Sequence, residues 1–328
     1  MPAVWIPKRL VEYSLINVAS ENTERFVQRC ETQYENRIFQ AAGAVLESGR
    51  KIVMLTGPSA SGKTTTAHKL AQALTLRGRT AKVISLDNFY LNKDVYPRLP
   101  DGSKDYENIM ALDLPCIQKC LKQLIEEDHC DLPVFDFTTE SRTEEVQHLD
   151  AEGGIVIVEG IHALNPIMTA ALPENSCFKI YAGLREEYSD EDGERMLSTR
   201  DIRCARRMTR DVRFRGHSPE QTLALWDRVC EGEDRYIKVF KNEANLLIDT
   251  AFSYEVCVLA GLMAPMAGLL PAEHNLSNRL NALVGRFSRF EKLDPSVIPE
   301  NSMLLEFYGI VGSDALGLSE RIRLTGVH

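Results

Sequence analysis

The sequence lacks the features of a membrane or secreted protein. A spanning helix needs roughly 18 or more consecutive apolar residues, and no apolar run reaches that length. The first residues show no charged segment followed by an apolar one, so we expect no secretory signal. Basic residues are in deficit, with 38 Lys and Arg against 47 Asp and Glu and a net charge of −9. This balance argues against nucleic acid as the main partner.

Cysteine is present without a framework that would give it a disulfide or metal role. The eight cysteines are scattered, and most lie in apolar periodic stretches, as buried thiols do. Cys116 and Cys120 have helical spacing but no matching histidine pair, which argues against zinc. We therefore expect a reduced, cytoplasmic protein.

Short apolar runs alternate with helical patterns from residue 50 to about 250. The runs, each typical of a buried strand, cover 52–55, 82–86, 155–158, 177–181 and 245–248. Alternation at this interval is typical of βαβ units. The sequence predicts an α/β protein with a parallel sheet of the P-loop NTPase type, flanked by helices.

The two ends of the chain have a different pattern from this core. Residues up to about 50 show helical periodicity, and 256–270 and 275–290 predict two further helices. We expect an N-terminal helical segment at 1–50, an α/β core at 51–250 with a lid around 194–217, and a C-terminal helical accessory region at 251–328. The flanking helices are expected to pack on the core or on a second subunit, and we expect a homo-oligomer.

The strongest motif is a P-loop that follows the first predicted strand. Its sequence is Gly-Pro-Ser-Ala-Ser-Gly-Lys-Thr at 57–64. The glycines let backbone N–H groups turn toward phosphate, and the following helix adds the positive end of its dipole. Lys63 is expected to reach the β- and γ-phosphates and Thr64 to ligate Mg²⁺. The expected nucleotide-binding residues are Gly57, Ser59, Ala60, Ser61, Gly62, Lys63, Thr64 and Thr65.

Two carboxylates follow predicted strands. Asp87 comes after 82–86, and Glu159 comes after 155–158. Active sites of open α/β sheets lie beyond the carboxyl ends of the strands. Each carboxylate alone could be a helix cap or turn residue, but beside a P-loop the pair predicts a Mg²⁺ site made with Thr64. Asp87 is expected to position an acceptor hydroxyl and to take its proton late, because phosphoryl transfer has a loose transition state.

Arginines form a third element downstream. Arg203, Arg206, Arg207 and Arg210 recur at helical spacing, and only Asp201 and Asp211 offset them nearby. A run of charge is often only a solvated helix face. Beside a P-loop core it favours a lid that closes on phosphates and excludes water. Lys63, Arg206 and Arg210 are thus expected to act with Asp87 in catalysis.

Other residues are less informative. His162 follows Glu159 closely and is expected to be a structural histidine with satisfied hydrogen bonds. Trp226 is expected to be a packing residue rather than a platform for a base.

The chain resembles the uridine kinase and phosphoribulokinase family. The resemblance rests on the P-loop, Asp87-Asn88-Phe89-Tyr90, the Pro-Val-Phe-Asp-Phe segment at 133–137, Ser141-Arg142, the Val-Glu-Gly-Ile segment at 158–161 and the arginine segment at 206–211. It covers roughly 50–250 and is similar to a longer bacterial branch of uridine or nucleoside kinases.

The resemblance implies roles for residues on the acceptor side. It implies that Asp87 faces a nucleoside 5′-hydroxyl and that the donor is ATP or GTP with Mg²⁺. It also implies a lid made by Arg203, Arg206 and Arg210. The substrate-binding residues that it implies are Tyr90, Glu107, Phe135, Phe137, Glu140, Arg142 and Arg203.

Two positions depart from the family pattern for reading pyrimidines. Phe135 stands where a Tyr is usual, and Glu140 stands where a His is usual. A buried polar group without its partner costs about 1–3 kcal/mol, enough to change base preference. Glu140 suits a donor edge such as that of guanine, or it points to solvent.

The sequence leaves two rivals to a nucleoside kinase. One is a kinase of another small polyol, such as a sugar or sugar phosphate. The other is a nucleotide-binding regulatory module that transfers no phosphate. Intact Lys63, Thr64, Asp87 and Glu159 argue against the second.

Overall fold

The centre of the protein is a five-stranded parallel sheet. The computed structural model describes residues 6–309. The strand order is β10-β7-β2-β6-β3, with β2 at Ile52–Thr56, β3 at Ala81–Ser85, β6 at Ile155–Glu159, β7 at Cys177–Gly183 and β10 at Leu246–Asp249. All five predicted strands are present within two residues of their expected ends, so the predicted fold class is confirmed.

Apolar residues cover both faces of this sheet. Every residue of β2 and β6 is buried. Alternate side chains point to opposite sides, so Val53 and Leu55 enter one core while Ile52 and Met54 enter the other. A strand buried on both faces has no polar alternation, and this explains the continuous apolar runs of the sequence.

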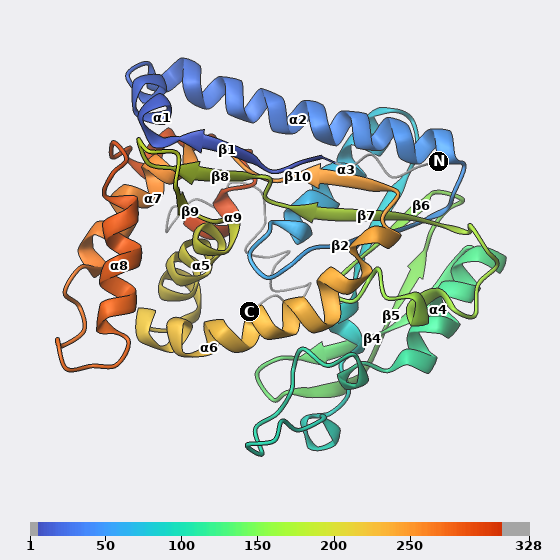
Figure 1. Ribbon diagram of the computed structural model, residues 1–328. Coiled ribbons are helices and arrows are strands. Elements are labelled where there is room, and N and C mark those ends of the chain that lie inside the picture. The colour runs from blue at the N-terminus through green and yellow to red at the C-terminus, as the bar shows by residue number, and fades with distance from the viewer. Residues whose placement is uncertain (1–5, 310–328) are drawn as a thin grey trace.

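Helices cover each face (Figure 1). One face carries α2 (Thr23–Ser48), the longest helix at the top of the view, and α3 (Lys63–Leu76), which packs against it. The other face carries α4 (Leu114–Glu126), whose buried residues join the second core. α4 begins at Leu114, because the Asp113 side chain caps it by accepting from the Cys116 N–H.

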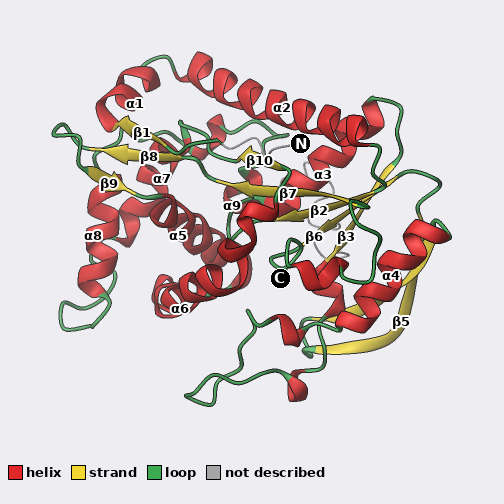
Figure 2. Cartoon of the chain, turned by 45° about the vertical axis from the view of Figure 1, so that its right-hand side comes forward, coloured by secondary structure: helices red, strands yellow, loops and turns green. Residues whose placement is uncertain are grey.

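Two smaller sheets were not anticipated. The strands β1 (Arg9–Glu12), β8 (Glu186–Ser189) and β9 (Arg195–Leu197) form a three-stranded sheet in the order β1-β8-β9. The strands β4 (His129–Asp136) and β5 (Ser141–Asp150) form an antiparallel hairpin, which Figure 2 shows beside α4 and away from the main sheet. Most of β5 is exposed, so no buried apolar run marked it in the sequence.

The remaining helices cluster at the end of the molecule away from the hairpin (Figures 1 and 2). They are α1 (Tyr13–Ser20), α5 (Thr199–Arg210), α6 (Pro219–Gly232), α7 (Glu255–Met263), α8 (Ser277–Phe287) and α9 (Leu305–Tyr308). Short 3₁₀ helices cover Leu86–Phe89, Lys93–Val95, Ile109–Ala111, Pro166–Thr169, Lys238–Glu243, Ala264–Met266 and Pro295–Val297, and π turns cover Asp211–Arg215 and Glu233–Ile237.

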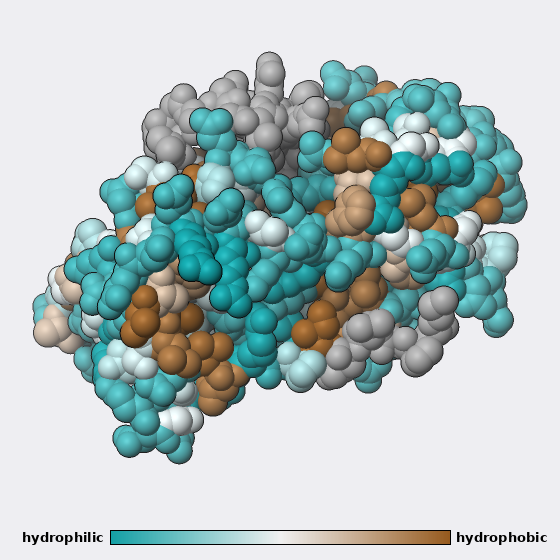
Figure 3. All heavy atoms as spheres, turned by 90° about the horizontal axis from the view of Figure 1, so that it is seen from above, coloured by the Kyte–Doolittle hydropathy of each residue, from teal (hydrophilic) through white to brown (hydrophobic). Residues whose placement is uncertain are grey.

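The flanking helices belong to the same core as the sheet. Residues of α2, α7, α8 and α9 pack in one apolar cluster with β2 and α3. The helical segments at both ends therefore pack on the α/β core. Nothing among residues 6–309 forms a helix that could span a membrane, and the face seen in Figure 3 is largely hydrophilic with separate apolar patches.

A buried ion pair joins α5 to the C-terminal helices. Arg206 on α5 and Glu255 on α7 are 0% and 1% exposed. The guanidinium donates to both carboxylate oxygens at 2.6 and 2.7 Å, and the Tyr308 hydroxyl donates to the same carboxylate. The Arg206 guanidinium also lies 4.9 Å from the centre of the Phe307 ring.

Glu255→Ala should strongly destabilise the fold. The change leaves a buried guanidinium unpaired, for which we expect a loss of about 3–5 kcal/mol in the free energy of unfolding. Asp227→Ala, which breaks the exposed Arg279–Asp227 pair, is the control and should lose less than about 1 kcal/mol. Urea denaturation measures both. Equal losses would contradict the structural role of the buried pair.

Candidate functional site

The loop at 57–62 has the tight geometry of a phosphate cradle. A Cβ on Gly57 would lie 2.3 Å from the Ala182 carbonyl oxygen, so only glycine fits there. Gly62 has φ +81° and Ala60 has φ +58°, both in the left-handed region. This conformation turns the loop back on itself between β2 and α3.

The cradle offers unpaired donors to an anion. Gly62 is the N-cap of α3, and no side chain caps this helix. The Ser61 hydroxyl oxygen is buried and has no hydrogen-bond partner among the residues that the structure describes. Buried polar groups normally find a partner, and helix N-termini attract anions. The loop therefore fits a phosphate group.

The structure brings together the three residues predicted to bind metal. Strand β6 lies between β2 and β3, so Glu159 at its end lies beside the P-loop and the turn that carries Asp87. The Thr64 hydroxyl donates to Glu159 at 3.3 Å. These hard oxygen donors are of the type that Mg²⁺ prefers.

The two carboxylates carry the electrostatic marks of a cation site. Burial raises the pKa of Glu159 to about 7, the Asp87 charge adds to this rise and the Lys63 charge opposes it. Burial also raises the pKa of Asp87, while Lys63 and Arg215 lower it. A cation between the carboxylates would relieve their repulsion and favour their ionised forms.

The arginine face of α5 contacts the P-loop directly. Arg203 donates to the Ser59 carbonyl at 2.9 Å, and Arg207 donates to the Ser59 hydroxyl at 3.0 Å. Arg206 reaches the Ala60 carbonyl at 3.3 Å. The predicted lid helix thus lies against the loop that would hold phosphate.

Three arginines next to this contact share a single buried aspartate, Asp211. Asp211 is 1% exposed and is within 4 Å of Arg207, Arg210 and Arg215. Burial, together with the Arg210 charge, lowers the pKa of Arg215 to about 10. One carboxylate among three guanidinium groups leaves excess positive charge beside the P-loop. Such a site attracts the anionic end of a nucleotide.

Two of the predicted arginines, Arg203 and Arg206, contact the P-loop but are also buried in ion pairs. Arg206 is wholly buried with Glu255, so it holds α5 in place and its role toward phosphate stays a prediction. Arg203 is 2% exposed and donates to Glu233 at 2.6 Å, and its guanidinium lies 5.7 Å from the Trp226 ring. Trp226 is 4% exposed, as expected of a packing residue.

Aromatic side chains gather on the other side of Asp87. Tyr90 contacts Tyr96 and Phe135 with ring centres 5.9 and 5.8 Å apart, and Phe135 contacts Phe137 at 4.9 Å. Tyr106 packs edge-on against Tyr96 at 5.5 Å. The charges of Asp87 and Glu107 raise the pKa of Tyr90 further above the rise that burial causes. This aromatic wall therefore lies next to Asp87, the predicted catalytic base.

Two other predicted substrate-binding residues are engaged within the protein. Arg142 donates to the carbonyls of Phe89 and Tyr90 and to Asp113, with distances of 2.8–3.1 Å. It thereby fastens the hairpin to the Asp87 turn. Glu140, at φ +51° in the hairpin loop, accepts from Lys104 at 2.8 Å and from Tyr106 at 3.1 Å.

Glu107 lies deeper in the site. Burial raises the pKa of this carboxyl, whereas the charges of Arg207 and Lys63 lower it. A Cβ on Gly232 would lie 2.8 Å from Glu107 carbons, so the end of α6 closes over it. Among the predicted acceptor-side residues it is thus within electrostatic reach of both Lys63 and Asp87.

The C-terminal region contributes residues that the sequence analysis missed. Glu306 accepts from the Thr65 hydroxyl at 2.6 Å. The Met303 sulfur lies 2.4 Å from where a Cβ on Gly62 would be. Nothing local in the sequence marks these residues, because their contacts with the P-loop helix span more than 200 positions. They form one wall of the loop.

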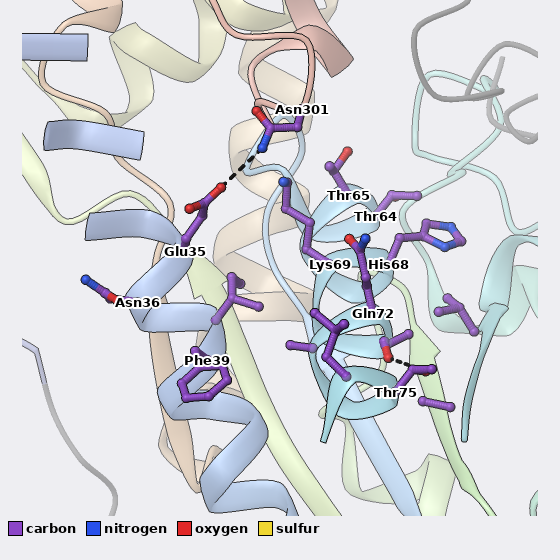
Figure 4. Close-up of a pocket in the computed structure, with 16 residues that line it drawn as sticks. Glu35, Asn36, Phe39, Thr64, Thr65, His68, Lys69, Gln72, Thr75 and Asn301 are labelled. Atoms are coloured by element: carbon purple, nitrogen blue, oxygen red, sulfur yellow. Dashed lines mark hydrogen bonds between the residues drawn. The ribbon is translucent and has the colours of Figure 1, made fainter. Parts of the chain in front are cut away.

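A groove of about 900 Å³ lies between α2 and α3 (Figure 4). Thr64, Thr65 and Lys69 line it from α3, and Glu35 lines it from α2. Asn301 bridges to Glu35 at 3.2 Å at one end. The groove reaches the first turn of the P-loop helix from the side of α2.

The cradle, the paired carboxylates and the arginine face define a P-loop phosphotransferase that acts on a hydroxyl acceptor. Residues 52–183 match the model of the Phosphoribulokinase / Uridine kinase family, so the chain is similar to that family over this part of its core.

Known proteins similar to this chain are kinases. A uridine kinase from Lactobacillus helveticus is 27% identical over 208 residues, 63% of this chain and 90% of that protein. A uridine-cytidine kinase B from Dictyostelium discoideum is 28% identical over 198 residues, covering 60% and 73%. A solved structure of a possible uridine kinase from Bacillus stearothermophilus has a TM-score of 0.45 and 19% identity, covering 65% of this chain and 98% of that one.

Gly62→Ala should disable nucleotide binding. The substitution puts a Cβ into the left-handed region and against the Met303 sulfur, so the loop or the Met303 side chain must shift. Gly78→Ala is the matched control, since Gly78 has φ +80°, follows the same helix and has open space around it. Both changes should cost about 1–2 kcal/mol in strain, but only Gly62→Ala should abolish ATP binding measured by calorimetry. Unchanged ATP affinity would contradict the cradle geometry.

Proposed function

We propose that the protein transfers the γ-phosphoryl group of ATP or GTP to the 5′-hydroxyl of a nucleoside, in the manner of a uridine/cytidine kinase. The observation that carries this proposal is the aromatic wall beside Asp87. A planar base stacks on aromatic rings, whereas a small sugar needs chiefly hydrogen bonds. The uridine kinases among the relatives support the same acceptor class.

The donor side supports a nucleoside triphosphate. The P-loop offers an uncapped helix N-terminus and the unpartnered Ser61 hydroxyl, and the guanidinium groups around Asp211 supply excess positive charge. The described residues contain no group of three or more His, Cys, Asp or Glu side chains able to enclose a metal alone. Mg²⁺ commonly takes one or two carboxylates and completes its shell with substrate phosphates and water. Thr64, Glu159 and Asp87 fit that partial role.

Asp87 is the residue that would position the acceptor. Its carboxylate would orient the hydroxyl and accept its proton late in the transfer, because a loose transition state gains little from a strong base. Lys63 and the arginines around Asp211 would stabilise charge on the transferred group. Bound Mg²⁺ would neutralise the β- and γ-phosphate oxygens. The contact of α5 with Ser59 would keep water away.

This proposal does not specify which nucleobase the acceptor nucleoside carries. Phe135 offers no hydroxyl, and the Glu140 carboxylate already accepts from Lys104 and Tyr106. In this arrangement neither is a free reader of a pyrimidine edge. A purine nucleoside therefore stays within the proposal. Residence in the cytoplasm and assembly as a homo-oligomer also stay predictions.

A substrate panel tests the proposed acceptor. Uridine, cytidine, guanosine, inosine and thymidine are compared with fructose, glycerate and ribulose 5-phosphate, each with ATP or GTP and Mg²⁺, by ADP or GDP release. We expect turnover with at least one nucleoside. Turnover of a sugar or sugar phosphate alone would overturn the nucleoside assignment and leave the phosphotransferase class intact.

Asp87→Asn should separate binding from chemistry. The amide keeps the shape of the side chain but cannot accept the proton, so kcat should fall at least about 100-fold while ATP binding is retained. Asp131→Asn, at an exposed position on β4, is the control. Steady-state kinetics and calorimetry with ATP measure the two effects. An unaltered kcat would contradict the role given to Asp87.

A further inference from the structure

His162 is a buried histidine with unused hydrogen-bonding capacity. It lies three residues after Glu159, at the carboxyl end of β6, and is 1% exposed. Neither ring nitrogen makes a well-formed hydrogen bond in the described part of the chain, although the Glu107 backbone lies close enough to influence the ring. His162 is thus buried as expected, but its ring lacks the well-formed hydrogen bonds expected of a satisfied structural histidine. Burying an imidazole without a hydrogen-bond partner costs more free energy than burying an apolar side chain. Packing alone therefore does not explain a histidine at this position.

The backbone around His162 is, by contrast, fully fastened. The Thr56 hydroxyl donates to the Ile161 carbonyl at 2.7 Å. The Asn165 N–H donates to the His162 carbonyl at 2.9 Å. The side chain is therefore held at a fixed place at the strand end. Fixed placement with free nitrogens is what a binding residue requires.

The ring lies on the acceptor side of the site. It packs edge-on against Tyr236, with ring centres 6.1 Å apart and an interplanar angle of 70°. The Tyr236 hydroxyl donates to Asp105 at 3.1 Å, and Asn108 donates to Asp105 at 3.3 Å. Asp105 and Asn108 belong to the loop that carries Glu107.

The charges around His162 connect it to the reacting groups. Burial lowers the pKa of His162 to about 4, and this outweighs the opposing influence of the Glu107 backbone and the Asp105 carboxylate. Glu107 in turn is within reach of the charges of Lys63 and Asp87. At neutral pH the imidazole is uncharged, so it presents one donor and one acceptor.

This chemistry selects an uncharged partner. The side-chain charge that acts on His162 itself is that of Asp105, which is acidic and disfavours an anionic acceptor group at the ring. A hydroxyl or amide can both donate and accept, which matches the two nitrogens of a neutral imidazole. The positive charge of the site lies instead around Asp211, on the donor side.

We propose that His162 is a specificity residue of the acceptor site and hydrogen-bonds to an uncharged polar group of the phosphoryl acceptor. The inference rests on the proposed kinase reaction, because it presumes an acceptor bound between Asp87 and the loop of Asp105 and Glu107. It does not depend on the acceptor being a nucleoside.

The test compares His162→Phe with His162→Gln and His162→Asn. Phe keeps the ring volume without a hydrogen bond, while the amides keep a donor and an acceptor. With the best acceptor of the wild-type panel, we expect His162→Phe to raise the acceptor KM about tenfold or more and to leave the ATP KM within about twofold. At least one amide variant should recover part of the loss.

Acceptor analogues that each lack one polar group identify the partner. Removing the group that His162 binds should raise the acceptor KM of the wild type. It should have little further effect on the acceptor KM of His162→Phe, as in a double-mutant cycle. His148→Phe, at an exposed position on β5, is the control and should match the wild type. If His162→Phe does not fold, the shift in melting temperature caused by the acceptor in the amide variants decides the question.

Two results would overturn the proposal. One is an unchanged acceptor KM in His162→Phe. The other is an increase in the acceptor KM that is the same for every analogue in the wild type and in His162→Phe, as a merely structural histidine would give. Failure of the nucleoside assignment has a different signature, since the wild type would then prefer a sugar and the same variants would be tested with that sugar.

Discussion

The buried pair between Arg206 and Glu255 is the interaction on which the arrangement of the site depends. It fixes α5 to α7, and through Tyr308 to the last described helix. Because α5 is held there, its neighbouring arginines contact the P-loop at Ser59 and surround Asp211. A charge buried this completely tolerates little displacement, since moving it away from its partner leaves it without solvation.

The site that results is divided by charge. Lys63 and the arginines around Asp211 make the donor side positive, which suits a triphosphate. Asp87, Glu107 and Asp105 make the acceptor side negative, and aromatic rings and a neutral His162 complete it. The reacting hydroxyl would lie at the boundary, where a carboxylate and a metal ion can act on it together. A neutral acceptor fits this division better than a phosphorylated one.

Much of this could be predicted from local sequence. The apolar strands, the glycines of the loop and the carboxylates after β3 and β6 each follow from short-range rules, because a strand buried on both faces has little freedom in composition. The hairpin of β4 and β5 could not be predicted in this way, since most of β5 is exposed and carries no apolar period. The contacts of Met303 and Glu306 with the P-loop helix could not be predicted for another reason, namely that they join distant parts of the chain.

The sequence by itself determined the parallel sheet, the phosphate cradle and the presence of Asp87 and Glu159 at neighbouring strand ends. These follow from periodicity and from the few residues that a tight turn permits. Only the tertiary structure decided which arginines of α5 are buried in ion pairs with Glu233 and Glu255 and which surround Asp211. It alone showed that His162 is buried without a well-formed hydrogen bond to its ring in the described chain. Helical spacing places side chains on a face, but burial and the partners across that face decide whether each charge is used for packing or left for a ligand.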